Sequence, residues 1–187
     1  MTYKDVLREI AAYQHGYVTT HDAEQVGVPG VELRKLAARG GLDHVARGVY
    51  RFPDAPNRAT DPYMQAVLRV GADAVLVGES VLALHDLALI DPRKIQVATP
   101  RRVRLTDPGF VEVIQREVPQ DEITAYDGVP ATKLWRALID SIGHVMTERL
   151  QFALAEALRR DLVTSAEAAR VRRALRAQRP ITLRGRR

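Results

Sequence analysis

The spacing of hydrophobic residues in the N-terminal quarter of the chain predicts three short helices followed by a hairpin. In residues 3–13 the apolar positions fall on one helical face: Val6, Leu7, Ile10 and Tyr13. His15-Gly16 then interrupts the pattern, and residues 19–27 predict a second, shorter helix. The chain therefore begins with two helices joined by a break.

The second helix carries polar residues suited to its two ends. Thr19 or Thr20 can accept hydrogen bonds from the first N–H groups, and Asp22 lies in the first turn, where the helix dipole favours an anion. Gly27 follows the last turn and can adopt the positive φ of a helix end. The N–H groups at the start of such a helix are also able to bind a phosphate.

A third helix has one apolar and one basic side. Pro29 opens it, because the first turn does not need the N–H group that proline lacks. Leu33 and Leu36 point to one side, and Gly40-Gly41 ends the helix. The other side carries the basic residues Arg34, Lys35 and Arg39.

A two-stranded ribbon follows the third helix. Residues 42–52 alternate loosely between apolar and polar, and they turn at Arg47-Gly48, where glycine supplies a positive φ. His44 and Arg51 lie on its strands. Three helices followed by a hairpin are the order of a winged helix-turn-helix, in which the hairpin is the wing.

The remaining pattern predicts a second domain of mixed type. Residues 53–62 contain three prolines and predict a linker. Period-two alternation predicts strands at 94–100 and 110–118, and the Asp127-Gly128 turn predicts a hairpin over 123–132. Helical spacing recurs in 62–72, 78–88, 133–145 and 147–160, and a last basic helix follows the cap at Thr164-Ser165.

We therefore predict an α+β protein of two domains. Residues 1–55 form a winged helix-turn-helix that binds DNA. Residues 60–187 pack helices on a small antiparallel sheet and end in a basic helix and tail.

Composition narrows the class of protein. Apolar residues make up 46% of the 187 residues, which is enough for a packed core. The chain has no cysteine, which excludes disulfides and thiolate zinc sites. Neither a signal peptide nor an apolar run long enough to cross a bilayer is evident, so we expect a cytoplasmic protein with no membrane association.

Charge is distributed unevenly along the chain. Residues 1–52 have a net charge of +1, residues 53–148 a net charge of −4, and residues 149–187 a net charge of +8. Such asymmetry indicates a polyanion or an acidic partner at one end, and arginine suits bidentate contact with phosphate. A solvated basic tail, or the arginine bias of a GC-rich genome, explains the same composition.

The predicted winged helix fits duplex DNA physically. A major groove about 12 Å wide accepts one helix, which must be held by a core on one side and present polar groups on the other. The candidate DNA contacts are Thr19, Thr20, Arg34, Lys35, Arg39, His44, Arg47 and Arg51. A protein-interaction module with a solvated basic face is the alternative interpretation.

Several segments in order resemble the AbiEi-type antitoxins of type IV toxin–antitoxin systems. The first is "GYVTTHDAEQVGVPGVELRKLAARGGLDHVARGVYRF", with Arg47-Gly48-Val49-Tyr50-Arg51 as its most telling part. Then come "GESVLALHDL" at 78–87, similar to a Ser-x-x-x-x-His helix, and "GVPATKLWRALID" at 128–140. The opening of the third helix, Pro29-Gly30-Val31-Glu32, departs from the family by lacking basic or hydroxyl residues.

The resemblance implies a function. Members are bicistronic antitoxins whose winged helix binds operator DNA and represses their own operon, and whose C-terminal domain counters a nucleotidyltransferase-like toxin. Dimeric or cooperative occupation of two half-sites fits such repression. The alternative is an antitoxin that neutralises its toxin by direct binding and contacts DNA little or not at all.

No feature of the sequence predicts an enzyme, a cofactor or a metal site. The five histidines lack the i+3 or i+4 spacing of helical metal ligands, and no Gly-rich phosphate loop follows a strand. An enzyme that modifies nucleic acid or the toxin stays a minor alternative. The basic C-terminal helix could bind toxin, further nucleic acid or only solvent through Arg170, Arg172, Arg173 and Arg176.

Overall fold

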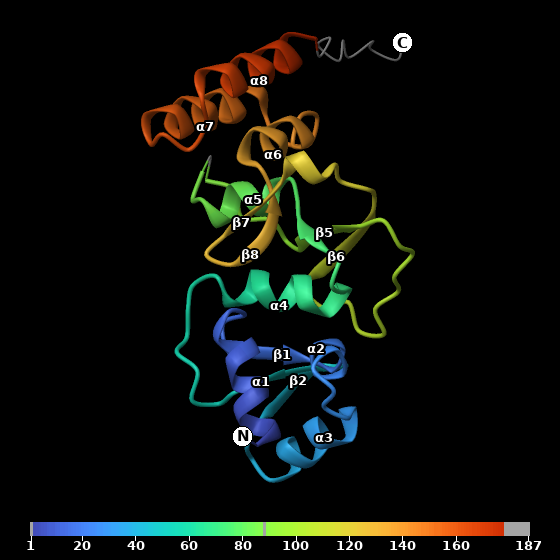
Figure 1. Cartoon of the computed structure of the whole chain (residues 1–187). Coiled ribbons are helices and arrows are strands. Elements are labelled where there is room, and N and C mark those ends of the chain that lie inside the picture. Colours follow the sequence, from blue (N-terminus) through green and yellow to red (C-terminus); the bar gives the residue numbers. More distant parts are fainter. Residues whose placement is uncertain (1, 88, 178–187) are drawn as a thin grey trace. The chain divides into compact units, whose positions relative to one another are not determined.

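The structure, a computed structural model, describes residues 2–87 and 89–177 (Figure 1). The chain divides into two compact units that alternate in sequence. Unit 1 consists of Met1–Val77 and Arg93–Thr132, and unit 2 consists of Gly78–Pro92 and Lys133–Arg187. The predicted C-terminal tail, 178–187, lies outside the described residues.

The N-terminal part of unit 1 has the elements of a winged helix. Their order is α1 (Tyr3–Ala12), β1 (Tyr17–Thr19), α2 (Thr20–Gln25), α3 (Gly30–Ala38), β2 (Asp43–Ala46) and β3 (Val49–Arg51). The strands form an antiparallel sheet in the order β1-β3-β2. The predicted three helices and hairpin are confirmed, and β1 is an addition: its three residues are all buried, so they show no alternation.

One hydrophobic core holds these elements together. Leu7 on α1, Val18 on β1 and Leu33 on α3 are completely buried, and Tyr50 and Phe52 close the core from the hairpin side. The helices meet at this core because each buries only one face. The opposite face of α3 is thereby left in solvent.

The second half of unit 1 is a five-stranded sheet with one helix packed on it. Its elements are α4 (Asp61–Val70), β4 (Val75–Leu76), β5 (Ile95–Thr99), β6 (Val111–Gln115), a 3₁₀ turn (Gln120–Glu122), β7 (Ile123–Tyr126) and β8 (Val129–Thr132). The strand order is β6-β5-β4-β8-β7. Helix α4 contacts β4, β5 and β8 of this sheet and also β3 of the winged helix.

The predicted antiparallel sheet needs a correction, although the mixed α and β class is confirmed. Strands β5 and β6 pair in parallel, as do β4 and β8, so the sheet is mixed. Alternation along a strand predicts its two faces but carries no information on the direction of its neighbour. Two consecutive parallel strands need a connection that carries the chain back to the end of the sheet where the first strand began. Loop 100–110 is this connection between β5 and β6.

Unit 2 is a small helical cluster. It contains α5 (Glu79–Leu84), α6 (Leu134–Asp140), α7 (Thr147–Arg159) and α8 (Ser165–Ala177). Helix α6 contacts α5 and α8, and α7 contacts α8. Helix α6 is shorter than the predicted 133–145, because the chain leaves helical geometry after Ser141, whose hydroxyl donates to the Ala137 carbonyl at 2.8 Å.

The predicted domain boundary between residues 55 and 60 lies inside unit 1. Compactness therefore groups the winged helix with α4 and the mixed sheet. The assignment of separate roles to residues 1–55 and 60–187 concerns function and stays a prediction. In the described part of the chain, no helix is long and apolar enough to cross a membrane.

Candidate nucleic-acid interface

Helix α3 presents a basic surface. Leu33 is completely buried and fixes the helix against the core. The exposed residues Arg34, Lys35 and Arg39 lie within an arc of about 140° on the other side, given 3.6 residues per turn. Lys35 pairs with Glu32 at 2.8 Å, an exposed pair that contributes little stability and is readily given up to a phosphate.

Arg34 and Arg39 are available to a ligand. Within the described residues, neither forms an ion pair with a carboxylate, and both side chains are exposed. The N-terminal turn of the helix offers only Gly30, Val31 and Glu32, with no side-chain cap. The positive charge of α3 therefore lies along its middle and C-terminal part.

The wing is a tight turn tied to the start of α2. Gly48 has a φ of 71°, as expected for the hairpin turn, and its carbonyl accepts a hydrogen bond from the Thr20 N–H at 2.9 Å. Arg47 at the tip is exposed and forms no ion pair among the described residues. His44 is also exposed, with its ring 5.0 Å from that of Tyr50.

The two threonines at the start of α2 serve the fold. Thr19 is buried and forms a capping box with Asp22: its hydroxyl lies 2.7 Å from the Asp22 carboxylate and accepts from the Asp22 N–H at 3.1 Å. The carboxylate thus occupies the position where a phosphate was expected. Thr20 is half-buried against Gly48, and the contact of both threonines with DNA stays a prediction.

Arg51 lies on β3 of the wing, as predicted, but its side chain is engaged by other parts of unit 1. Its side chain is only 14% exposed, and its guanidinium lies 3.0 Å from the Asp61 carboxylate. The same group donates to the Pro56 carbonyl at 3.1 Å and lies 5.4 Å from the Tyr17 ring centroid. Periodicity placed Arg51 on the wing but could not reveal that α4 covers this part of the strand.

A buried polar network, which the sequence did not suggest, joins the winged helix to the rest of unit 1. His15 is 4% exposed; its Nδ1 lies 3.1 Å from the Asp61 carboxylate and its Nε2 lies 2.6 Å from the Asp127 carbonyl. Both ring nitrogens therefore face oxygen atoms, one from α4 and one from the β7–β8 turn. His15-Gly16 indicated only a helix break, because the partners lie far away in sequence.

Asp127 carries this network to the β7–β8 turn. Its carboxylate accepts hydrogen bonds from the Thr60 hydroxyl at 2.5 Å and from Arg58 at 2.8 Å. The hydrogen bond from Thr60, with His15 and Arg58 nearby, lowers the pKa of Asp127 below its usual value. The wing-bearing subdomain is therefore anchored by polar contacts as well as by apolar packing.

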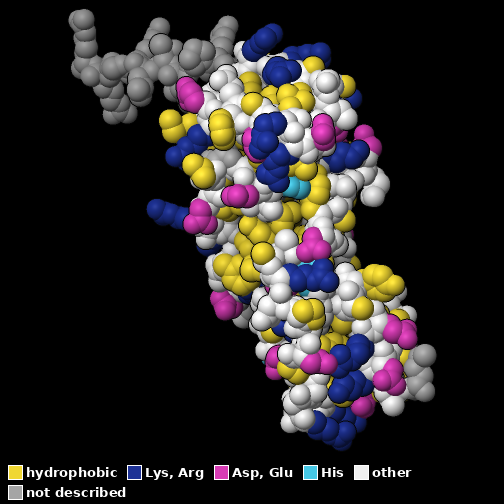
Figure 2. Space-filling view, turned by 90° about the vertical axis from the view of Figure 1, so that its left-hand side faces the viewer, with side chains coloured by type: hydrophobic (Ala, Val, Ile, Leu, Met, Phe, Trp, Pro, Cys, Tyr) yellow, Lys and Arg dark blue, Asp and Glu magenta, His cyan; other side chains and the backbone are white. Residues whose placement is uncertain are grey.

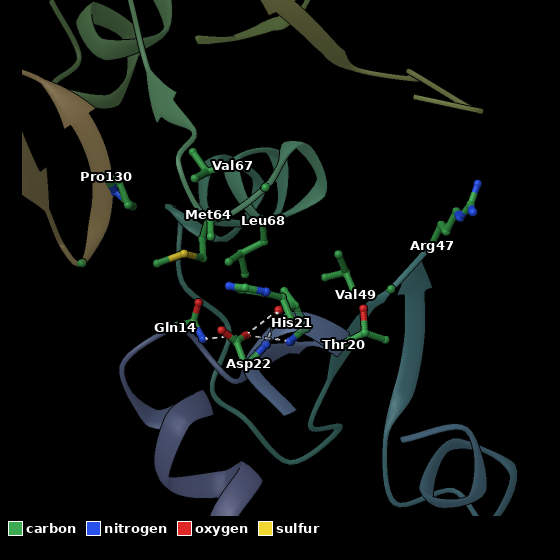
Figure 3. Close-up of a pocket in the computed structure, with 15 residues that line it drawn as sticks. Gln14, Thr20, His21, Asp22, Arg47, Val49, Met64, Val67, Leu68 and Pro130 are labelled. Atoms are coloured by element: carbon green, nitrogen blue, oxygen red, sulfur yellow. Dashed lines mark hydrogen bonds between the residues drawn. The ribbon is translucent and has the colours of Figure 1, made fainter. Parts of the chain in front are cut away.

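A pocket of about 340 Å³ lies where α2, the wing and α4 meet (Figure 3). Figure 3 shows His21 and Leu68 facing its interior, the Gln14 amide bonded to Asp22, and Arg47 directed away from the other labelled side chains. The walls are largely apolar. Arg47 thus lines the pocket while its side chain remains exposed to solvent.

The basic residues of α8 lie in unit 2. Arg172, Arg173 and Arg176 are exposed, whereas the Arg170 guanidinium lies 5.3 Å from the Trp135 ring centroid. Arg172 and Arg176 flank a shallow pocket of about 480 Å³ whose floor includes Leu154 and Leu175. Figure 2 shows dark-blue and yellow side chains interspersed over these helices, at the top of the view.

Unit 2 also holds one strongly perturbed histidine. Burial lowers the pKa of His85 to about 4, and Arg160, whose guanidinium donates to the His85 carbonyl at 2.8 Å, acts in the same direction. His85 is therefore neutral at physiological pH. Among the described residues, no group of three or more acidic or histidine side chains is arranged to hold a metal ion.

The N-terminal elements of unit 1 thus define a winged helix with a basic, solvent-exposed helix and an arginine-tipped wing, a class of domain that binds DNA. Residues 5–53 match the family model described as a transcriptional regulator, AbiEi antitoxin. The match supports an AbiEi-type antitoxin with an N-terminal DNA-binding region, and it confirms the resemblance found in the sequence. Among the curated proteins, none matches the chain.

Proposed function

We propose that the chain binds operator DNA of its own operon through α3 and the wing, and so acts as a transcriptional autorepressor of a bicistronic toxin–antitoxin system. The observation that carries this proposal is a set of arginines that have no carboxylate partner within residues 2–87 and 89–177: Arg34 and Arg39 on α3, and Arg47 on the wing. All three arginines lie in residues 5–53, the segment that matches the AbiEi regulators.

The charge pattern indicates how DNA would be read. Arginine binds phosphate bidentately, so Arg34, Arg39 and Arg47 suit the backbone of a duplex. The first turn of α3 offers Gly30 and Val31 instead of donors to base edges. We therefore expect affinity to depend strongly on salt and to discriminate only moderately between sequences, with two copies on half-sites about 34–36 Å apart adding selectivity.

The test measures binding to a duplex taken from the DNA upstream of the chain's own reading frame. We expect Arg34→Gln combined with Arg39→Gln to weaken binding at least tenfold, about 1.4 kcal/mol, and to flatten the salt dependence. Arg149→Gln combined with Arg159→Gln removes the same charge from α7 and is the matched control. Equal affinities of the two double variants would overturn the proposal.

We further propose that unit 2 counters the toxin, which the family resemblance implies is nucleotidyltransferase-like. Two observations favour direct binding. Phe152 on α7 and Met146 just before it are each 65% exposed. Arg172 and Arg176 border the pocket between α7 and α8. Exposed apolar side chains and exposed arginines in one compact unit suit a partner that offers both an apolar patch and acidic side chains.

Co-expression with the product of the adjacent reading frame tests this second role. We expect Phe152→Ser combined with Arg176→Gln to lose both rescue of growth and co-purification with that product, while DNA binding is retained. Rescue without co-purification would instead indicate neutralisation without contact. Retention of both by the double variant would remove α7 and α8 from the proposal.

A further inference from the structure

A groove of about 770 Å³ lies in unit 1 beside the tip of the wing. Three elements line it: the wing, helix α4 and loop 100–110, which connects β5 to β6. We call it the wing-tip groove. The match to the AbiEi regulators ends at residue 53, so two of its three walls lie outside the matched segment.

Each wall contributes one arginine: Arg47 from the wing, Arg69 from α4 and Arg104 from the loop. Arg47 and Arg104 are exposed, and within the described residues neither has an ion-pair partner. Asp107 is the one carboxylate residue in the lining. The groove therefore carries a net positive charge, as expected for a surface that binds an anion.

The loop is held in place at both ends of its basic stretch. The Arg101 guanidinium makes two hydrogen bonds of 2.7 Å to the Asp73 carboxylate, and these bonds lower the pKa of Asp73. Further along, Arg69 donates to the Asp107 carbonyl and lies 5.3 Å from the Phe110 ring centroid. Arg104 lies between these two anchored points, so little ordering is needed for it to meet a ligand.

We propose that loop 100–110 and the wing tip together bind a stretch of DNA backbone, so that the operator interface extends beyond the winged helix to Arg104. The proposal rests on the proposed DNA binding, because a duplex that meets Arg47 at the wing passes the mouth of the same groove. Phosphates recur regularly along each strand, and arginine binds them bidentately.

The test uses the full chain and the upstream duplex described above, with fluorescence anisotropy at several salt concentrations. We expect Arg104→Gln to weaken binding about three- to tenfold, to all duplexes alike, and to reduce the slope of log affinity against log salt by about one. Arg104→Lys should restore the slope, since it keeps the charge. Arg149→Gln, which removes one charge from unit 2, should leave the slope unchanged.

The outcomes separate the two proposals. If the Arg34 and Arg39 variant weakens binding while Arg104→Gln binds like the parent, the groove proposal falls and the proposed function stands. If Arg104→Gln and Arg149→Gln weaken binding equally, the effect is one of net charge and the groove proposal also falls. If the parent chain does not bind the duplex, both proposals fall. Circular dichroism of each variant checks that the fold is retained.

Discussion

At the scale of single residues, Asp61 connects the winged helix to the rest of unit 1. Its carboxylate is nearly buried and receives three partners: His15 at 3.1 Å, Arg51 at 3.0 Å and the Arg58 N–H at 3.1 Å. A buried carboxylate is tolerated only when it is paired and hydrogen-bonded. The same contacts engage Arg51, so a contact of Arg51 with DNA, which stays a prediction, would have to replace its pairing with Asp61.

We predict that Asp61→Asn lowers the free energy of unfolding by about 3 kcal/mol, because it leaves His15 and Arg51 buried beside a neutral group. Urea denaturation at pH 7 measures the change. Asp54→Asn is the matched control: Asp54 also pairs with an arginine, Arg8, but at the surface, so its loss should be much smaller than that of Asp61→Asn. Equal losses for both variants would contradict the buried network.

At the scale of elements, two glycines with the same backbone angle differ in their surroundings. Gly27 after α2 and Gly48 in the wing both have a φ of 71°. A Cβ at Gly27 meets nothing within 4 Å, whereas a Cβ at Gly48 would lie 3.0 Å from the Thr20 hydroxyl. The wing turn is therefore constrained by its contact with α2 as well as by its own geometry.

We predict that Gly27→Ala costs about 1 kcal/mol, since alanine is strained at this φ, and that Gly48→Ala costs about 1 kcal/mol more. The additional loss comes from displacement of the Thr20 side chain. Chemical denaturation of the two variants gives the difference. A difference of zero would mean that Thr20 moves aside freely and does not hold the wing.

At the scale of the whole chain, the boundaries of the compact units differ from the predicted functional boundary between residues 55 and 60. The winged helix shares unit 1 with α4 and the mixed sheet, so DNA binding as proposed draws on residues on both sides of the predicted linker. Residues 1–55 include His15 and Arg51 but none of their carboxylate partners. The N-terminal segment alone is therefore incomplete.

We predict that a fragment of residues 1–55 melts roughly 10–20 °C below the full chain, as expected for a small domain that loses about 3 kcal/mol. Near-ultraviolet circular dichroism, which reports on the tyrosines of the β1–β3 sheet, follows the transition. The Asp61→Asn full-length protein should melt between the two. A fragment as stable as the full chain would support the predicted boundary as that of an autonomous folding domain.

The candidate site was predictable from sequence only in part. Helix ends and hairpin turns depend on residues a few positions apart, so Thr19, Gly27 and Gly48 act as expected. The exposure of Arg34 and Arg39 also followed from helical periodicity around Leu33. Whether a polar side chain on a strand meets solvent or another element depends on distant segments, and for this reason the pairing of Arg51 with Asp61 was not predicted.

The sequence by itself therefore determined the three helices and the hairpin of the winged helix, although not β1, because periodicity, caps and glycine turns act locally. Tertiary structure alone decided the parallel pairing of β5 with β6, the burial of His15 against Asp61, and the meeting of Arg47 with Arg104 at one groove. Each of these depends on contacts between residues about 15 to 60 positions apart. Such contacts follow from the packing of whole elements against a common core, which no local pattern encodes.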